Sequence, residues 1–189
     1  MQIIQDFIPT GRRNRPALPM TPKYISCHDT ANPSAGADAK AHAAYVKTYP
    51  NLEAGWHFTV CSKAIYQHLP LTENGWHASD GYNGTGNRQS IAVEICENKD
   101  GDRAQAEENA AWLAAKLIKE VPSLLPFPTC MKQHFDWSGK NCPRVLRGRP
   151  GGWDGFLQQV AENLKPASCP ECERLKGLIA DAARILERA

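Results

Sequence analysis

Residues 23–50 read KYISCHDTANPSAGADAKAHAAYVKTYP and combine two different periodicities in one short stretch. The first seven residues alternate apolar and polar side chains and end in His28 and Asp29, which predicts a β-strand that delivers its last side chains to a sheet edge. Residues 37–50 are rich in alanine, start beside the capping residue Asp38 and stop before a proline, which predicts a helix. A strand followed at once by a helix is typical of an α/β fold.

The same two patterns return farther along the chain. The stretch WHFTVCSKAIYQHLP (56–70) predicts a β-hairpin that turns near Ser62 and Lys63, and the β-branched run QSIAVEICEN (89–98) predicts a buried strand. Residues 103–125 predict a long helix. Its apolar face is expected to carry Ala106, Ala110, Leu113, Leu117 and Ile118. Strands interleaved with helices predict an α/β domain.

The end of the chain has a different organisation. The segment RPGGWDGFLQQVAENLK (149–165) predicts a turn and a closing helix, so we expect one main domain over residues 1–165. Residues 166–189 read as a short linker and a terminal amphipathic helix. Three roles stay open for that helix: packing on the domain, self-association, and docking to a partner. The CPEC motif of the linker, with Cys169 and Cys172, is a weak metal or redox signal because no second such pair occurs.

Composition argues against several classes of function. The chain has 189 residues and a net charge of +2, with no dense basic block beyond GRRNRPA near its start, so nucleic acid is not an expected partner. It has no apolar run near the roughly 20 residues that cross a bilayer and no signal-peptide pattern, so we expect a protein made in the cytoplasm without a transmembrane segment. Seven scattered cysteines favour a reducing compartment over a disulfide framework.

One segment concentrates groups that bind metal. In KQHFDWSGKNCP, His134 stands eight residues before Cys142, and Lys140 stands two residues before that cysteine. Imidazole nitrogen and thiolate sulfur both suit Zn²⁺, but two ligands do not complete a site. His28 is the best candidate for a third, because a strand end holds a side chain rigidly and leaves it open to a cleft. Two further histidines stay open as alternatives: His57 and His77.

Several longer motifs occur together and in a familiar order: IPTGRRNRPALPMTPKYISCHDTANPSAGADAKAHAAYV, AGWHFTV, GWHASDGYN, SIAVEICEN and HFDWSGKNCP. From about Ile8 to Phe156 the chain resembles the zinc-dependent N-acetylmuramoyl-L-alanine amidases of the amidase-2 family, which include phage endolysins and autolysins of Gram-positive bacteria. Phage T7 lysozyme and the peptidoglycan recognition proteins are more distant relatives. The resemblance implies a mixed central β-sheet flanked by helices. It also implies that Zn²⁺ is bound by His28, His134 and Cys142.

The resemblance further implies a reaction, the hydrolysis of the amide between the lactyl group of N-acetylmuramic acid and L-alanine of the stem peptide. Glu94 and Lys140 match catalytic positions of the family. Desolvation in an apolar strand raises the pKa of a carboxylate, which suits a proton shuttle, and a cation beside the metal stabilises a tetrahedral intermediate. From the residues alone, Glu94 could also mark the solvent face of an edge strand, and Lys140 could be an ordinary loop lysine.

The family pattern is broken at one position. Some relatives, among them T7 lysozyme, carry a catalytic tyrosine where this chain has Trp56, so that role is lost here or has moved to Glu94. His57, in the same WHF motif, is expected to be a strand-core histidine. The loop GWHASDGYNGTGNRQ is expected to line the peptide groove, with Asp80 among its polar residues. The residues expected to bind substrate are His77, Trp56, Tyr82 and Asn87.

Three functions of different classes follow. The favoured one is a peptidoglycan amidase, which we expect to be a phage or prophage endolysin that lyses Gram-positive cell walls after release from the cytoplasm. The second is a non-catalytic peptidoglycan-binding module, which the three metal-ligand candidates argue against. The third is a regulatory partner protein, with the terminal helix as its docking element.

Overall fold

A computed structural model describes residues 1–166 together with 174–175, 178–179 and 184. The expected linker and amphipathic helix fall mostly outside these residues, and the CPEC motif falls wholly outside them. The proposed roles of that helix, self-association included, therefore stay predictions. In the described part of the chain, no helix is long and apolar enough to span a membrane.

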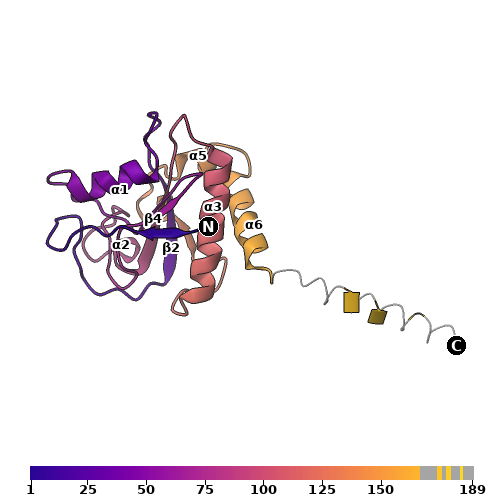
Figure 1. The fold of residues 1–189 in the computed structure, drawn as a ribbon. Coiled ribbons are helices and arrows are strands. Elements are labelled where there is room, and N and C mark those ends of the chain that lie inside the picture. The colour runs from indigo at the N-terminus through magenta and orange to yellow at the C-terminus, as the bar shows by residue number, and fades with distance from the viewer. Residues whose placement is uncertain (167–173, 176–177, 180–183, 185–189) are drawn as a thin grey trace.

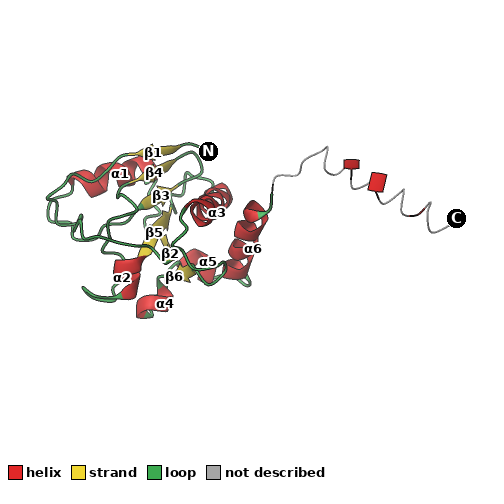
Figure 2. Ribbon diagram, turned by 90° about the horizontal axis from the view of Figure 1, so that it is seen from below, coloured by secondary structure: helices red, strands yellow, loops and turns green. Residues whose placement is uncertain are grey.

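The centre of the domain is a six-stranded mixed β-sheet with strand order β1-β4-β3-β5-β2-β6 (Figure 2). The strands are β1 (Ile3–Gln5), β2 (Tyr24–Asp29), β3 (Phe58–Val60), β4 (Ile65–Gln67), β5 (Ser90–Ile95) and β6 (Met131–Gln133). The β3/β4 hairpin is antiparallel and all other neighbouring strands are parallel. The predicted hairpin and the mixed sheet are therefore confirmed.

Helices cover both faces of this sheet. They are α1 (Ala39–Thr48), α2 (Thr85–Gln89), α3 (Arg103–Glu120), α4 (Phe135–Ser138), α5 (Arg144–Arg147) and α6 (Gly152–Leu164). Figures 1 and 2 show α3 and α6 side by side on one face and α1 on the other. The larger core lies under α3 and α6, and a smaller cluster lies on the α1 face around Val46, Trp56 and Ala92.

In the two central strands, β2 and β5, alternate side chains point either into the hydrophobic core or toward the candidate site. Successive strand residues point to opposite faces. In β2 and β5, Ile25 and Ile91 join the core under α3, whereas His28 and Glu94 point to the opposite face. His28 and Glu94 are also partners in the parallel ladder. The register therefore places an imidazole and a carboxylate next to each other at the carboxyl end of the sheet.

Local sequence features explain where α1 begins and where α3 ends. Asp38 caps α1 by accepting a hydrogen bond of 2.9 Å from the N–H of Ala41, as the sequence predicts. Helix α3 ends at Glu120, five residues before the predicted end. The correction has a simple cause: Pro122 disfavours the helical conformation of the residue before it, Val121.

The sequence gives no signal for several short elements. Strands β1 and β6 are three residues long and too short for a periodic pattern. Helix α2 lies within the glycine-rich loop that precedes β5, and α4 lies within the segment expected to be a loop. These short elements matter because α2, α4 and β6 border the candidate site.

Candidate metal and catalytic site

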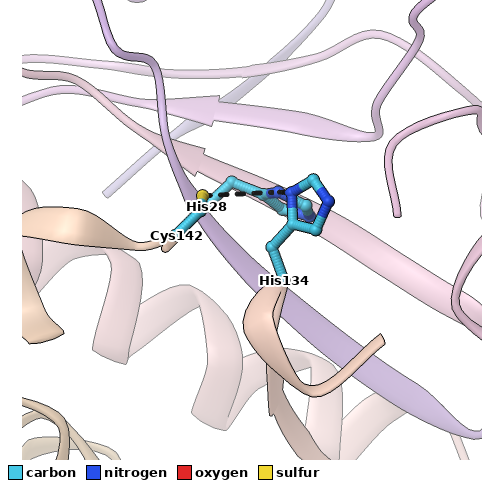
Figure 3. A group of neighbouring side chains, drawn as sticks. All are labelled: His28, His134 and Cys142. Carbon is cyan, nitrogen blue, oxygen red and sulfur yellow. Dashed lines mark hydrogen bonds between the residues drawn. The ribbon is translucent and has the colours of Figure 1, made fainter. Parts of the chain in front are cut away.

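Three side chains converge at the carboxyl end of the sheet (Figure 3). His28 comes from β2, His134 directly follows the neighbouring parallel strand β6, and Cys142 lies in the loop before α5. The Nδ1 atoms of His28 and His134 are 3.0 Å apart, and the Sγ of Cys142 is 3.8 Å from Nδ1 of His28. All three side chains are buried, and their ligand atoms lie within 4.8 Å of one another.

The donor set fits a divalent cation. Burial holds the pKa of His28 well below its ordinary value and lowers that of His134 to about 4, so both imidazoles are neutral and have a free lone pair. Burial also raises the pKa of the Cys142 thiol to about 12. A thiolate at this position therefore needs a cation beside it, and two imidazoles with one thiolate suit Zn²⁺.

Glu94 lies next to the three ligand candidates. Its Oε1 is 3.9 Å from Nδ1 of His28, and its side chain is 15% exposed. Burial, and to a lesser degree the negative charge of Asp29, raise the pKa of Glu94 to about 8 against the opposing effect of Lys140. Its Oε2 atom has no hydrogen-bond partner within the described residues. The predicted rise in pKa is therefore confirmed, and this carboxyl can take up or release a proton near neutral pH.

The nine residues proposed from the sequence as metal ligands, catalytic groups or substrate-binding residues all line one cavity of about 660 Å³. They are His28, His134, Cys142, Glu94, Lys140, His77, Trp56, Tyr82 and Asn87. A second cavity of about 450 Å³ shares Trp56, Ala54 and Glu94 with the first. Glu94 thus contributes to the walls of both cavities.

Several of these residues have polar contacts within the protein. Asn87 is buried, and its Oδ1 accepts hydrogen bonds of 2.8 Å from the backbone N–H groups of His77 and Ala78. The indole of Trp56 donates to Thr59 at 2.7 Å. Tyr82 differs, since it is 62% exposed at the cavity rim. Of the four proposed substrate contacts, Tyr82 offers the most accessible ring.

Two neighbouring expectations have different outcomes. His57 is fully buried beside β3, where its Nε2 lies 2.9 Å from the carbonyl oxygen of Glu73 and its Nδ1 accepts from the N–H of Ala92 at 3.0 Å. The prediction of a structural histidine is confirmed. Asp80 does not line the cavity. Its carboxylate instead accepts from the backbone N–H groups of Gly86 and Asn87 and so holds the first turn of α2.

Sequence reasoning missed other residues of the cavity wall. Trp76 pairs with Tyr82, with ring centroids 5.5 Å apart, and both line the cavity. Arg13 and Glu53 form an exposed ion pair of 2.5 Å at its rim. The WHA motif could have indicated Trp76, because it repeats the WHF motif that contains Trp56. Nothing local indicates the other two residues, which are 40 positions apart in the chain.

Comparison with known proteins defines the class. The family model described as N-acetylmuramoyl-L-alanine amidase, Amidase_2, matches residues 18–145. The chain therefore belongs to the amidase-2 family. It is 52% identical over 166 residues to the N-acetylmuramoyl-L-alanine amidase CwlH of Bacillus subtilis, covering 87% of this chain and 63% of the relative. For the amidase XlyA of the same organism the identity is 54%, with coverage of 82% and 50%.

Comparison with solved structures shows that the chain has the fold of amidase-2 catalytic domains. The catalytic domain of XlyA superposes with a TM-score of 0.79 at 53% sequence identity, covering 85% of this chain and 99% of that domain. The structure of PlyL matches with a TM-score of 0.74 at 34% identity, covering 85% of this chain and 97% of PlyL. The chain thus spans nearly all of a solved catalytic domain but only 63% and 50% of the curated relatives CwlH and XlyA.

Proposed function

We propose that this chain is the catalytic domain of a zinc-dependent N-acetylmuramoyl-L-alanine amidase, which hydrolyses the amide between N-acetylmuramic acid and L-alanine in peptidoglycan. One observation carries the proposal: two imidazoles and a thiol converge within 4.8 Å in a cavity that also exposes a carboxyl with a raised pKa. The names of the similar proteins CwlH and XlyA support the same bond specificity.

In this proposal His28, His134 and Cys142 hold the metal. When bound, Zn²⁺ supplies a Lewis acid that polarises a carbonyl and lowers the pKa of water. Glu94 accepts a proton from the attacking water and passes it to the leaving amine of L-alanine. Lys140, which lines the same cavity, balances negative charge that develops on the carbonyl oxygen.

Because Trp56 stands where some relatives carry a catalytic tyrosine, we assign the proton transfer mainly to Glu94. An indole has no acidic proton to give near neutral pH, and the N–H of Trp56 is already bonded to Thr59. Of the tyrosines, Tyr82 lines the main cavity and is largely exposed. We assign Tyr82 to substrate contact together with His77, Trp56 and Asn87, and the acid–base role to Glu94.

We place the catalytic unit at residues 1–165 and assign residues 166–189 to a linker and an amphipathic helix, for which self-association is one of the three roles considered above. Among the solved relatives is a mutant endolysin from Bacillus subtilis at 53% identity. This likeness supports a biological role as a phage or prophage endolysin, made in the cytoplasm and acting on Gram-positive cell walls after release.

A matched pair of cysteine variants tests the proposal against a non-catalytic wall-binding module. Cys142 and Cys96 are both buried, but only Cys142 belongs to the ligand cluster. We expect Cys142→Ala to lose bound zinc and wall lysis while it still sediments with purified walls. Cys96→Ala should keep zinc and lysis. Full lysis by zinc-free Cys142→Ala would refute the metal assignment, whereas wall binding without lysis by the zinc-loaded wild type would favour the binding module.

A further inference from the structure

A row of hydrogen-bonded side chains runs beneath the site and ends on a metal-ligand candidate. The indole Nε1 of Trp137 is 2.7 Å from Oγ of Ser26, which is 2.7 Å from Oγ of Ser90. Ser90 lies 3.5 Å from Nε2 of His77, whose Nδ1 is 3.1 Å from Nε2 of His28. These residues come from α4, β2, β5 and the loop before α2.

Two groups fix the direction of these hydrogen bonds. An indole N–H only donates, so Trp137 donates to Ser26. A carbonyl only accepts, and Ser90 donates its one hydroxyl proton to the carbonyl oxygen of Gly86 at 2.6 Å. Ser90 therefore has no proton left for its other partners. Ser26 must donate to Ser90, and His77 can meet Ser90 only with a ring N–H.

The direction continues through the two imidazoles. A neutral imidazole has one N–H and one bare nitrogen. Because His77 directs its Nε2–H at Ser90, its Nδ1 is the bare nitrogen and accepts from Nε2–H of His28. The bare nitrogen of His28 is then Nδ1, the atom that faces His134 and Cys142. That is the tautomer that a metal ligand bonding through Nδ1 requires.

We propose that Trp137, Ser26, Ser90 and His77 form a one-way hydrogen-bond chain that fixes the tautomer of His28, with His77 as the positioning residue. The inference deepens the proposed function, since it rests on the metal site assigned above. It also gives His77 a second role, in addition to the substrate contact proposed above. Both of its ring nitrogens have partners inside the protein, and the residue is 8% exposed.

Helix α2 holds this chain in place. Gly86 provides the carbonyl that accepts from Ser90, and Asn87 accepts from the backbone N–H of His77. A Cβ atom added at Gly86 would lie 2.5 Å from Cβ of Ala78 and 2.7 Å from Cγ of Trp137. Only glycine lets Trp137 approach α2 this closely. The packing of Trp137 on Gly86 therefore positions both the indole N–H that donates to Ser26 and the carbonyl oxygen that accepts from Ser90.

The test uses side chains that replace one ring nitrogen of His77 at a time. Asparagine puts its amide oxygen near the position of Nδ1 and can still accept from His28, whereas glutamine puts it near Nε2. We expect His77→Gln to bind Zn²⁺ about 10 to 100-fold more weakly than wild type, the usual effect of losing a partner that orients a ligand. His77→Asn should recover most of that loss. Affinity is measured by competition with a chromophoric chelator, and urea unfolding of the metal-free forms verifies folding.

A second measurement needs no metal and no activity. Long-range ¹H–¹⁵N correlation spectra of the metal-free protein report which ring nitrogen of each histidine carries the proton. We expect His28 as the Nε2–H tautomer in wild type and a mixture of tautomers in Ser90→Ala, because loss of the hydroxyl acceptor removes the contact that requires His77 to carry its proton on Nε2. An Nδ1–H tautomer of His28 in the wild type, or equal zinc affinities for wild type, His77→Asn and His77→Gln, would overturn the proposal. Absence of zinc binding by the wild type would instead refute the proposed function.

Discussion

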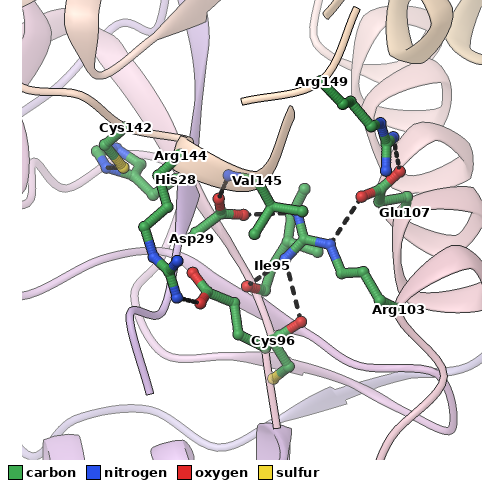
Figure 4. A network of polar contacts seen from close by, with 11 residues as sticks. His28, Asp29, Ile95, Cys96, Arg103, Glu107, Cys142, Arg144, Val145 and Arg149 are labelled. Atoms are coloured by element: carbon green, nitrogen blue, oxygen red, sulfur yellow. Dashed lines mark hydrogen bonds and ion pairs between the residues drawn. The ribbon is translucent and has the colours of Figure 1, made fainter. Parts of the chain in front are cut away.

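The carboxylate of Asp29 accepts a hydrogen bond of 2.7 Å from the backbone N–H of Val145 (Figure 4). Asp29 follows His28, and Val145 lies three residues after Cys142, so this contact joins the two segments that carry these ligand candidates. The other carboxylate oxygen pairs with Arg103 of α3 at 2.6 Å. A single buried side chain thus fixes the distance between the central strand and the late loop.

The network extends to the strand that carries Glu94. Arg103 also donates to the carbonyl oxygens of Ile95 and Cys96, at 3.3 and 3.1 Å, where β5 ends. Glu107 pairs with Arg103 at 2.7 Å and also with Arg149, which precedes α6. Side chains of α3 therefore hold the ends of β2 and β5, together with the segment before α6, in fixed relative positions.

Substitution of Asp29 should weaken both the fold and the candidate metal site. In Asp29→Asn the amide can still accept from Val145, but the partly buried Arg103 loses one of its two charged partners and keeps only Glu107. We expect a loss of about 3 kcal/mol in the free energy of unfolding, measured with urea, and weaker zinc binding. Asp136→Asn is the control, because its carboxylate also accepts a backbone N–H, that of Gln133, but in an exposed position. Equal stabilities of the two variants would contradict the anchoring role.

Glu94→Gln should separate chemistry from metal binding. The amide has nearly the same shape but cannot carry a proton. We expect kcat for wall hydrolysis to fall by about 10² to 10⁴-fold, with zinc content and wall binding close to those of wild type. The measurement is the rate of new amino-terminal alanine at saturating substrate. A kcat within a few-fold of wild type would exclude Glu94 as the proton carrier.

Acid should destabilise the fold through its buried histidines. Burial lowers the pKa of His57 to about 4 and that of His68 to about 3, whereas a histidine in an unfolded chain titrates near 6.5. The unfolded state therefore binds more protons at moderately acid pH. Stability is full above about pH 6.5 and falls as pH drops toward 4, by up to about 1.4 kcal/mol per pH unit for each histidine.

A comparison of pH profiles measures this effect for one histidine. His57→Gln removes the titrating group, so its urea midpoint should depend less steeply on pH between 6.5 and 4 than that of wild type, with a chelator present in both. Parallel pH profiles for the two proteins would show that His57 does not titrate with the predicted shift.

Helix α6 should be an integral part of the domain. Phe156 is buried in the main core and stacks on Trp153, with ring centroids 5.6 Å apart. Phe156→Ala should cost about 3 to 5 kcal/mol in the free energy of unfolding. Leu157→Ala, at the partly buried neighbouring position, should cost clearly less. Equal losses would show that the two positions are packed alike, against the structure.

Sequence patterns predicted the helices and strands that are long enough to show a periodic pattern of apolar residues. The alternation in 23–29 and the β-branched run 89–98 identified the two central strands, and Asp38 marked the start of α1. They also indicated residues that line one cavity, since strand ends and a loop rich in His, Cys and Lys are local features. The structure brings His28 and Cys142 together although 114 positions separate them.

Other parts of the site have no local signal. The three-residue strand β6, which positions His134, is too short to show a period. The hydrogen-bond chain from Trp137 to His28 joins residues up to 111 positions apart. Each of its serines is an ordinary strand residue in the sequence. Their role follows from the parallel register that sets Ser26 opposite Ala92 and beside Ser90.

The most direct test of the proposed activity is to identify the bond that the protein cleaves. Purified Gram-positive cell walls are digested, and new amino-terminal residues and new reducing sugar ends are assayed separately, before and after treatment with a zinc chelator. We predict new amino-terminal alanine without new reducing ends, lost on chelation and restored by added Zn²⁺. Release of reducing ends, or alanine release that persists after complete removal of zinc, would contradict a zinc-dependent amidase.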